Sequence, residues 1–103
     1  MKFVFSKEFD RVLKKQSEKQ LESLKKVFLE VRKANNISEI SNCKKLTDFS
    51  AIYRIRIGSQ RAFFHFHIKV EKDMVHFLYL VPRGQAYAKE MLNKLRKKDG
   101  LKI

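Results

Sequence analysis

An alternating run from Tyr53 to Arg83 constrains the fold of this chain more than any other feature. The run reads YRIRIGSQRAFFHFHIKVEKDMVHFLYLVPR, and apolar side chains recur at every second position through most of it. Successive side chains of a β-strand point to opposite faces of the sheet. The pattern therefore predicts strands with one apolar face. A hairpin with a two-residue loop is expected within Gly58–Arg61, and a second two-residue turn at Lys72-Asp73, which gives three antiparallel strands.

The two faces of this predicted sheet differ in chemistry. One face is apolar and is expected to carry Tyr53, Ile55, Ile57, Ala62, Phe64, Phe66, Ile68, Val70, Val75, Phe77, Tyr79 and Val81. The opposite face is expected to carry Arg54, Arg56, Arg61, Phe63, His65, His67, Lys69, His76, Leu78 and Leu80. Because arginines and all 3 histidines gather on the second face, we look for function there.

Two helices before the run are expected to cover the apolar face. Residues 2–5, KFVF, predict a short strand. Ser6 has the residue type of a helix N-cap, and a helix is predicted from Lys7 to about Gln16. Ser17, with glutamine three residues later, has the form of a capping box and predicts the start of a second helix.

The remaining segments complete a small α+β domain. Residues 36–50 read mostly as loop, and the segment from Gln85 to about Lys98 predicts a final helix with a basic side. The predicted order is strand, helix, helix, strand, strand, strand, helix. We therefore expect one domain over residues 1–103, with a twisted, mainly antiparallel sheet and an N-terminal helical hairpin packed on one face.

Charge and composition narrow the classes of partner and compartment. The formal net charge is +13, and the charge is spread along the chain, which favours a polyanionic partner, with nucleic acid first. Ribosomal RNA, an anionic membrane and an acidic protein remain alternatives on charge alone. The lone Cys43 excludes an internal disulfide and is typical of a reducing cytoplasm. The sequence has neither a signal peptide nor a run of membrane-spanning length, so no membrane partner is expected.

Several kinds of catalytic centre are disfavoured by what the sequence lacks. There is no glycine-rich phosphate loop, so no nucleotide cofactor is expected. His65, His67 and His76 could form a metal triad, but neighbouring arginines and Lys69 would repel a cation, so no metal is expected. Acidic pairs are absent from the predicted sheet, which disfavours a two-metal nuclease. Metal-free chemistry on a phosphodiester remains.

The arginine-rich face suits cleavage of RNA by its own 2′-hydroxyl group. Arginines fixed on strands would stabilise the extra negative charge of the transition state. Arginine cannot accept a proton at neutral pH, so His65, His67 or His76 is the candidate base. Tyr87 could stack on a base or transfer a proton. Further RNA contacts are expected from Lys69, Lys94, Arg96 and Lys97. Taken singly, each of these residues is also compatible with a solvated or packing role.

The layout of the chain and the run YRIRIGSQRAFFHF resemble the RelE/ParE superfamily of toxins from bacterial type II toxin–antitoxin systems. The resemblance spans nearly the whole chain, and its most telling part is the Y-R-I-R-I-G-x-x-R hairpin. The RelE branch enters the ribosomal A site and cleaves mRNA there. By motif, Arg54 and Arg56 match the paired basic residues, Arg61 the arginine opening the next strand, Arg83 the arginine ending the last strand, and Tyr87 the C-terminal tyrosine.

This resemblance leaves the target open. Both paired positions are arginine where lysine is often found, the spacing from Arg83 to Tyr87 is short, and strict alternation would place Arg83 on the apolar face. The ParE branch has the same fold and poisons DNA gyrase, but it generally lacks the full set of catalytic residues, so RelE-like activity is favoured. A non-catalytic nucleic-acid-binding module is a third reading. The implied partners are an acidic antitoxin, the ribosome (30S A site) and mRNA, with DNA contacted only through the toxin–antitoxin complex.

Overall fold

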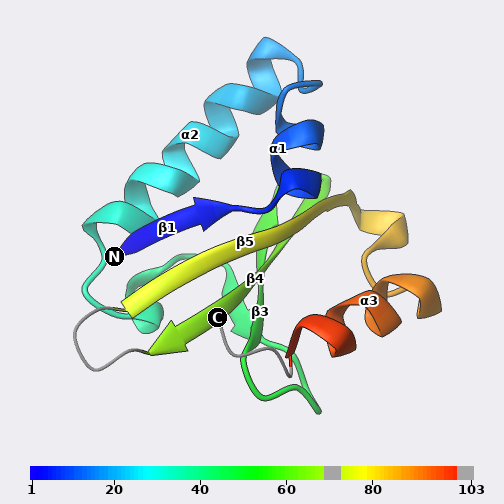
Figure 1. The fold of residues 1–103 in the computed structure, drawn as a ribbon. Helices are drawn as coiled ribbons and strands as arrows, with labels where there is room; N and C mark the ends of the chain where they lie inside the picture. Colours follow the sequence, from blue (N-terminus) through cyan, green and yellow to red (C-terminus); the bar gives the residue numbers. More distant parts are fainter. Residues whose placement is uncertain (69–72, 100–103) are drawn as a thin grey trace.

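A five-stranded sheet with helices on both faces forms the protein, as the computed structural model shows (Figure 1). The structure describes residues 1–68 and 73–99, apart from the side chains of residues 67, 68 and 73. The strands are β1 (Lys2–Phe5), β2 (Cys43–Lys45), β3 (Ile52–Ile57), β4 (Gln60–Ile68) and β5 (Asp73–Pro82). The helices are α1 (Lys7–Leu13), α2 (Glu18–Lys33) and α3 (Lys89–Asp99), with 3-10 turns η1 (Ile37–Glu39) and η2 (Arg83–Gln85).

The sheet is mixed but mostly antiparallel, as predicted. Its strand order is β1-β5-β4-β3-β2, and only the pair β1–β5 is parallel among the described strands. The short edge strand β2 lies in the segment that was predicted to be loop. Its three residues, Cys-Lys-Lys, carry no alternation, and the strand forms because β3 supplies pairing partners such as Arg54 for Lys44.

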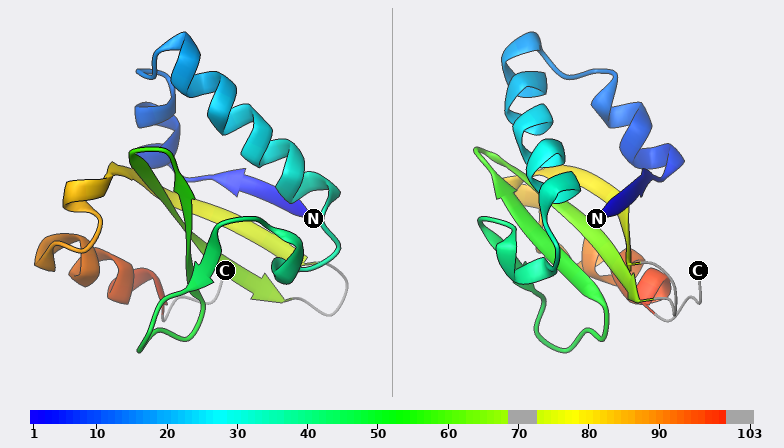
Figure 2. Two further views of the ribbon diagram at one scale, coloured as in Figure 1. Left: turned by 180° about the vertical axis from the view of Figure 1, so that it is seen from behind. Right: turned by 90° about the vertical axis from the view of Figure 1, so that its left-hand side faces the viewer.

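The starts of α1 and α2 were predicted well, whereas the end of α1 and the start of α3 were not. The Ser6 side chain accepts a hydrogen bond from the Phe9 amide at the start of α1, and the capping box at Ser17 is present. Helix α1 ends at Leu13, before the predicted limit. Helix α3 begins at Lys89 rather than Gln85, because residues 83–85 form a separate 3-10 turn that Ala86 closes. Helices α1 and α2 lie on one side of the sheet and α3 on the other (Figure 2).

The first hairpin is confirmed and the second turn is corrected. In the first, Ile57 pairs with Gln60, so the loop is residues 58–59, and Gly58 has φ +59°, the left-handed region that glycine adopts readily. In the second, Asp73 already belongs to β5 and pairs with Ile68, so it is not a turn residue. Lys72, the other half of that predicted turn, lies outside the described residues, as does Val70 on the predicted apolar face.

A β-bulge in β5 changes which side chains share a face. Phe63 pairs with Tyr79 and Phe64 with Phe77, so Leu78 is the extra residue. Beyond the bulge the alternation reverses. Tyr79 and Val81 lie on the α3 side and Leu80 on the α1/α2 side, so their predicted faces were wrong. Strict alternation had placed Arg83 on the apolar face together with Val81. Because the reversal moves Val81 to the α3 side, Arg83, two positions later, follows it to that side.

Each face of the sheet packs into a hydrophobic core of its own. The core under α1 and α2 centres on Phe77, which is 0% exposed and has five aromatic neighbours: Phe3, Phe5, Phe9, Phe28 and Phe64. The core under α3 contains Leu46, Phe49, Ile52, Phe63, Leu78, Ala86 and Leu95. The second face is therefore covered over much of its area by α3 and the loop that packs beside it. No described helix has the length and apolar character needed to cross a membrane.

Replacing the central ring should test how far stability depends on the α1/α2 core. We expect Phe77→Ala to lower the free energy of unfolding by about 3–5 kcal/mol, because the substitution leaves a cavity among five rings. Leu29→Ala, at a side chain that is 56% exposed, is the control and should change it by less than about 0.5 kcal/mol. Urea unfolding measures both. Equal effects of the two substitutions would contradict the described core.

Candidate functional site

Four arginines converge at the hairpin end of β3, β4 and β5. They are Arg54, Arg56, Arg61 and Arg83, called the arginine cluster below. Arg56 and Arg61 are direct cross-strand partners, and Arg54 lies two residues before Arg56 on the same face. The Arg83 amide donates to the Ser59 carbonyl at 2.8 Å, which fixes Arg83 beside the hairpin loop. The structure thus brings together the four arginines that the sequence singled out.

Arg61 is the buried member of the arginine cluster. Its side chain is 8% exposed, and its Nη1 donates to the carbonyl oxygens of Gly58 at 3.0 Å and Gln60 at 2.9 Å. Burial lowers the pKa of the guanidinium, the nearby Tyr87 hydroxyl opposes this shift, and the charges of the other three arginines add to it. The hairpin backbone therefore holds a positive charge in a fixed position.

The arginine cluster has no acidic partner within the described part of the chain. The one ion pair there joins Lys14 to Asp10 on α1, at 3.0 Å. The Nε of Arg54 is buried and has no hydrogen-bond partner among the described residues. Like charges held opposite each other destabilise a sheet, and a buried donor without an acceptor adds to the cost. An anion bound at the cluster would relieve both.

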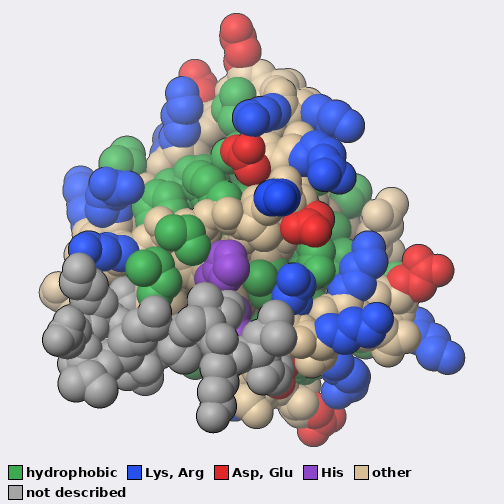
Figure 3. Space-filling view, viewed as in Figure 1, with side chains coloured by type: hydrophobic (Ala, Val, Ile, Leu, Met, Phe, Trp, Pro, Cys, Tyr) green, Lys and Arg blue, Asp and Glu red, His purple; other side chains and the backbone are tan. Residues whose placement is uncertain are grey.

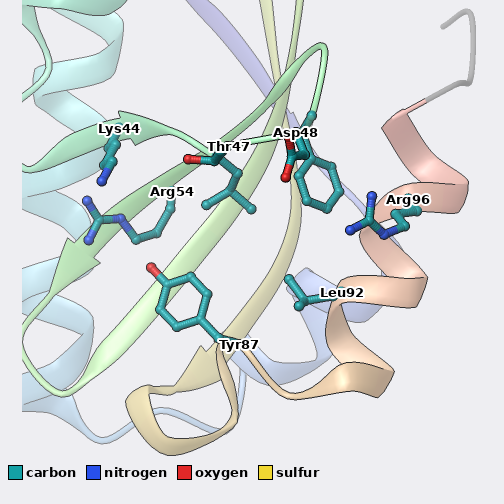
Figure 4. A pocket seen from close by; sticks show the side chains of 9 residues that line it. Lys44, Thr47, Asp48, Arg54, Tyr87, Leu92 and Arg96 are labelled. Atoms are coloured by element: carbon teal, nitrogen blue, oxygen red, sulfur yellow. The ribbon is translucent and has the colours of Figure 1, made fainter.

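Tyr87, in the link between η2 and α3, completes the site. Its ring is 52% exposed and packs edge-on against Phe63 at 6.3 Å and 84°, while Phe63 is fully buried. The hydroxyl points toward Arg54 (Figure 4). The supporting contact with Phe63 holds the ring in place while leaving one side open to a ligand.

A pocket of about 380 Å³ adjoins the arginine cluster at Arg54 and Tyr87. It is lined by Lys44, Leu46, Thr47, Asp48, Phe49, Arg54, Tyr87, Leu92 and Arg96 (Figure 4). The floor is apolar, and the guanidinium of Arg96 lies 4.9 Å from the ring centre of Phe49. The sequence singled out Arg54, Tyr87 and Arg96 but missed Lys44, Thr47 and Asp48. These three residues lie in the segment that was predicted to be loop. The pair of adjacent lysines, Lys44 and Lys45, was the one sequence feature there that indicated a binding site.

The loop that carries Thr47 and Asp48 is anchored at both ends. Leu46 and Phe49 are buried in the core under α3. The amides of Ser50 and Ala51 donate to the carboxylate of Asp99, at 2.8 Å and 2.7 Å. The end of α3 therefore holds this side of the pocket in position.

The two histidines whose side chains the structure describes, His65 and His76, do not lie at the arginine cluster. His65 is 3% exposed and pairs across the strands with Ile52 and His76, next to the core under α3. Burial lowers the pKa of His76, and the nearby charges of His65 and Lys98 lower it further. The side chain of His67 lies outside the described residues. Neither described histidine lines the pocket, so neither has the position expected of a base for bound RNA.

The other predicted contact residues are scattered. Lys94 lies over the Tyr79 ring, 5.9 Å from its centre, rather than at the pocket, and Lys97 is exposed on α3. Lys69 lies outside the described residues.

Burial raises the pKa of the Cys43 thiol to about 11, so this thiol is protonated at neutral pH and is a poor nucleophile. On the face of Figure 3, lysines and arginines outnumber acidic side chains, consistent with a polyanionic partner.

Comparisons with known proteins place the fold. No family model and no curated protein matches the sequence. A free double arginine-to-alanine mutant of the E. coli toxin RelE is similar in structure, with 23% identity over 94% of this chain and 95% of that chain and a TM-score of 0.67.

Two further structures are similar. A RelB–RelE antitoxin–toxin complex from Methanococcus jannaschii shares 21% identity over 82% of this chain and 94% of that chain, with a TM-score of 0.64. A YoeB/ParE toxin from Agrobacterium tumefaciens shares 10% identity over 80% of this chain and 98% of that chain, with a TM-score of 0.60. The chain therefore has the fold of RelE/ParE toxins, which confirms the resemblance at the level of fold.

Removing the Asp99 carboxylate should loosen the loop that carries Thr47 and Asp48. In Asp99→Asn the carboxylate loses charge and one acceptor oxygen, so the amides of Ser50 and Ala51 should exchange hydrogen about tenfold faster or more. Amide exchange followed by NMR measures this. Asp10→Asn, which removes only the exposed ion pair on α1, is the control and should leave both amides unchanged. Unaltered exchange in Asp99→Asn would show that other contacts hold the loop.

Proposed function

We propose that the protein is the toxin of a type II toxin–antitoxin system and acts inside the cell as a ribosome-dependent mRNA endonuclease. The observation that carries the proposal is the arginine cluster, four cations without an acidic partner in the described chain, with the exposed Tyr87 beside them. A fold shared with RelE toxins and a net charge of +13 support it.

The chemistry follows from what the cluster can stabilise. In the proposed reaction the 2′-oxygen of a nucleotide attacks the adjacent phosphorus and the bond to the 5′-oxygen breaks, leaving a cyclic phosphate and a 5′-hydroxyl end. The transition state carries extra negative charge on the phosphate oxygens. Arginines already fixed by the sheet, above all Arg61 with its carbonyl contacts, stabilise that charge without reorganising.

Proton transfer needs a group other than arginine. Tyr87 is exposed and its hydroxyl points toward Arg54, so we assign it the proton for the departing 5′-oxygen (Figure 4). His65 is buried, so we assign it a role in packing rather than in proton transfer. His67 remains a proposed proton acceptor. The structurally similar RelB–RelE complex from M. jannaschii contains an antitoxin. We therefore also propose an acidic antitoxin that binds this chain and neutralises its charge.

Induced expression with mapping of mRNA 5′ ends tests the function. The wild type should arrest growth and produce new ends inside translated codons. Arg56→Ala combined with Arg83→Ala should reduce those ends by about a hundredfold or more, since two donors to the transition state are lost. Both side chains are exposed, so the fold should survive.

The matched control is Lys14→Ala combined with Lys15→Ala, which removes the same charge from the exposed turn after α1 and should leave cleavage intact. Growth arrest without new mRNA ends would overturn the proposal in favour of a ParE-like inhibitor of DNA gyrase. Absence of arrest would overturn it in favour of a non-catalytic nucleic-acid-binding module.

A further inference from the structure

The pocket beside the arginine cluster contains a carboxylate that phosphate binding does not use. Asp48 lines the pocket together with Lys44, Arg54 and Arg96. Within the described residues it makes neither an ion pair nor a hydrogen bond, although three cations line the same cavity. A carboxylate here weakens the attraction for phosphate. A ligand held by its phosphate alone would therefore bind more tightly if Asp48 were absent.

The backbone presents this carboxylate in a fixed way. Asp48 has φ +66°, the left-handed region that only a few non-glycine residues such as Asp and Asn adopt readily. It lies between the buried side chains of Leu46 and Phe49, and the following amides are held by Asp99. A group held on a loop fixed at both ends loses little freedom on binding, which favours selectivity.

The rest of the pocket suits a flat ring attached to a phosphate. Leu46, Phe49 and Leu92 supply apolar surface, and Tyr87 offers an exposed aromatic face on which a base can stack. Arg54 and Lys44 are cross-strand neighbours that can hold the phosphate of the same nucleotide. The ligand class indicated by these groups is an unpaired RNA nucleotide.

We propose that this pocket reads one base of the RNA and that the Asp48 carboxylate selects guanine. The inference deepens the proposed function, since it gives the mRNA endonuclease a base preference. Guanine presents two adjacent N–H donors on its pairing edge, which match the two oxygens of a carboxylate. In adenine and cytosine a ring nitrogen lone pair stands beside the amino group, and in uracil carbonyl oxygens flank the single N–H, so each places an acceptor against Asp48.

Binding of single nucleotides tests the pocket independently of cleavage. The probes are the 3′-monophosphates of guanosine, adenosine, cytidine and uridine, titrated into the wild-type protein and followed by NMR shifts of the amides of residues 47–49. Guanosine monophosphate should bind about tenfold more tightly than the others. In Asp48→Asn the preference for guanosine monophosphate should be lost, because the amide offers one acceptor and one donor in place of two acceptors. Glu90→Gln, an equal change of charge on the exposed start of α3, should keep the preference.

Equal affinities in the wild type, or a preference that persists in Asp48→Asn, would overturn the assignment. In cells, the mRNA ends made by the wild type should be enriched beside guanine, and the ends made by Asp48→Asn should lose that enrichment. If Asp48→Asn loses cleavage while nucleotide preference stays unchanged, Asp48 transfers a proton instead and base reading is wrong. If the wild type binds guanosine monophosphate selectively but cleaves no mRNA, the base-reading pocket stands and the proposed nuclease fails.

Discussion

One extra residue in β5 is the constraint on which the arrangement of this protein depends. Phe77 and Leu78 are consecutive, yet Phe77 packs under α1 and α2 and Leu78 packs under α3. The bulge then turns Tyr79 and Val81 toward α3. A strand without the bulge would direct these two side chains to the first core and leave α3 with less apolar surface to cover. Because β5 leads into η2, the same reversal also sets the side on which Arg83 joins the other arginines.

The second core has a role beyond stability, since it carries one wall of the pocket. Helix α3 buries Leu95 against the sheet, and its last residue, Asp99, binds the amides that follow Phe49. The opposite wall is Arg54 on β3, supported by the sheet itself. The pocket is therefore formed where a rigid strand meets a loop tied to a helix, and its shape depends on the docking of α3.

The sequence was most informative where local chemistry determines structure. Alternation predicted β3 and β4, the side chains of Ser6 and Ser17 predicted two helix starts, and Gly58 marked the hairpin. A strictly alternating pattern does not reveal a bulge, so the faces of Tyr79, Leu80 and Val81 were predicted wrongly. A three-residue edge strand has no periodicity at all, so β2 and Lys44 were missed.

Burial by a distant element is equally invisible in a local pattern. His65 occupies a polar-face position by alternation, but α3, which begins more than 20 residues later, covers that part of the sheet. Arg56 and Arg83, at the hairpin end, stay exposed because η2 and Tyr87 separate β5 from α3. Positive charges are thus left open at one end of a face whose other end is a core. The resulting site has a charged part that suits phosphate and an apolar part that suits a base, and a nucleotide has both.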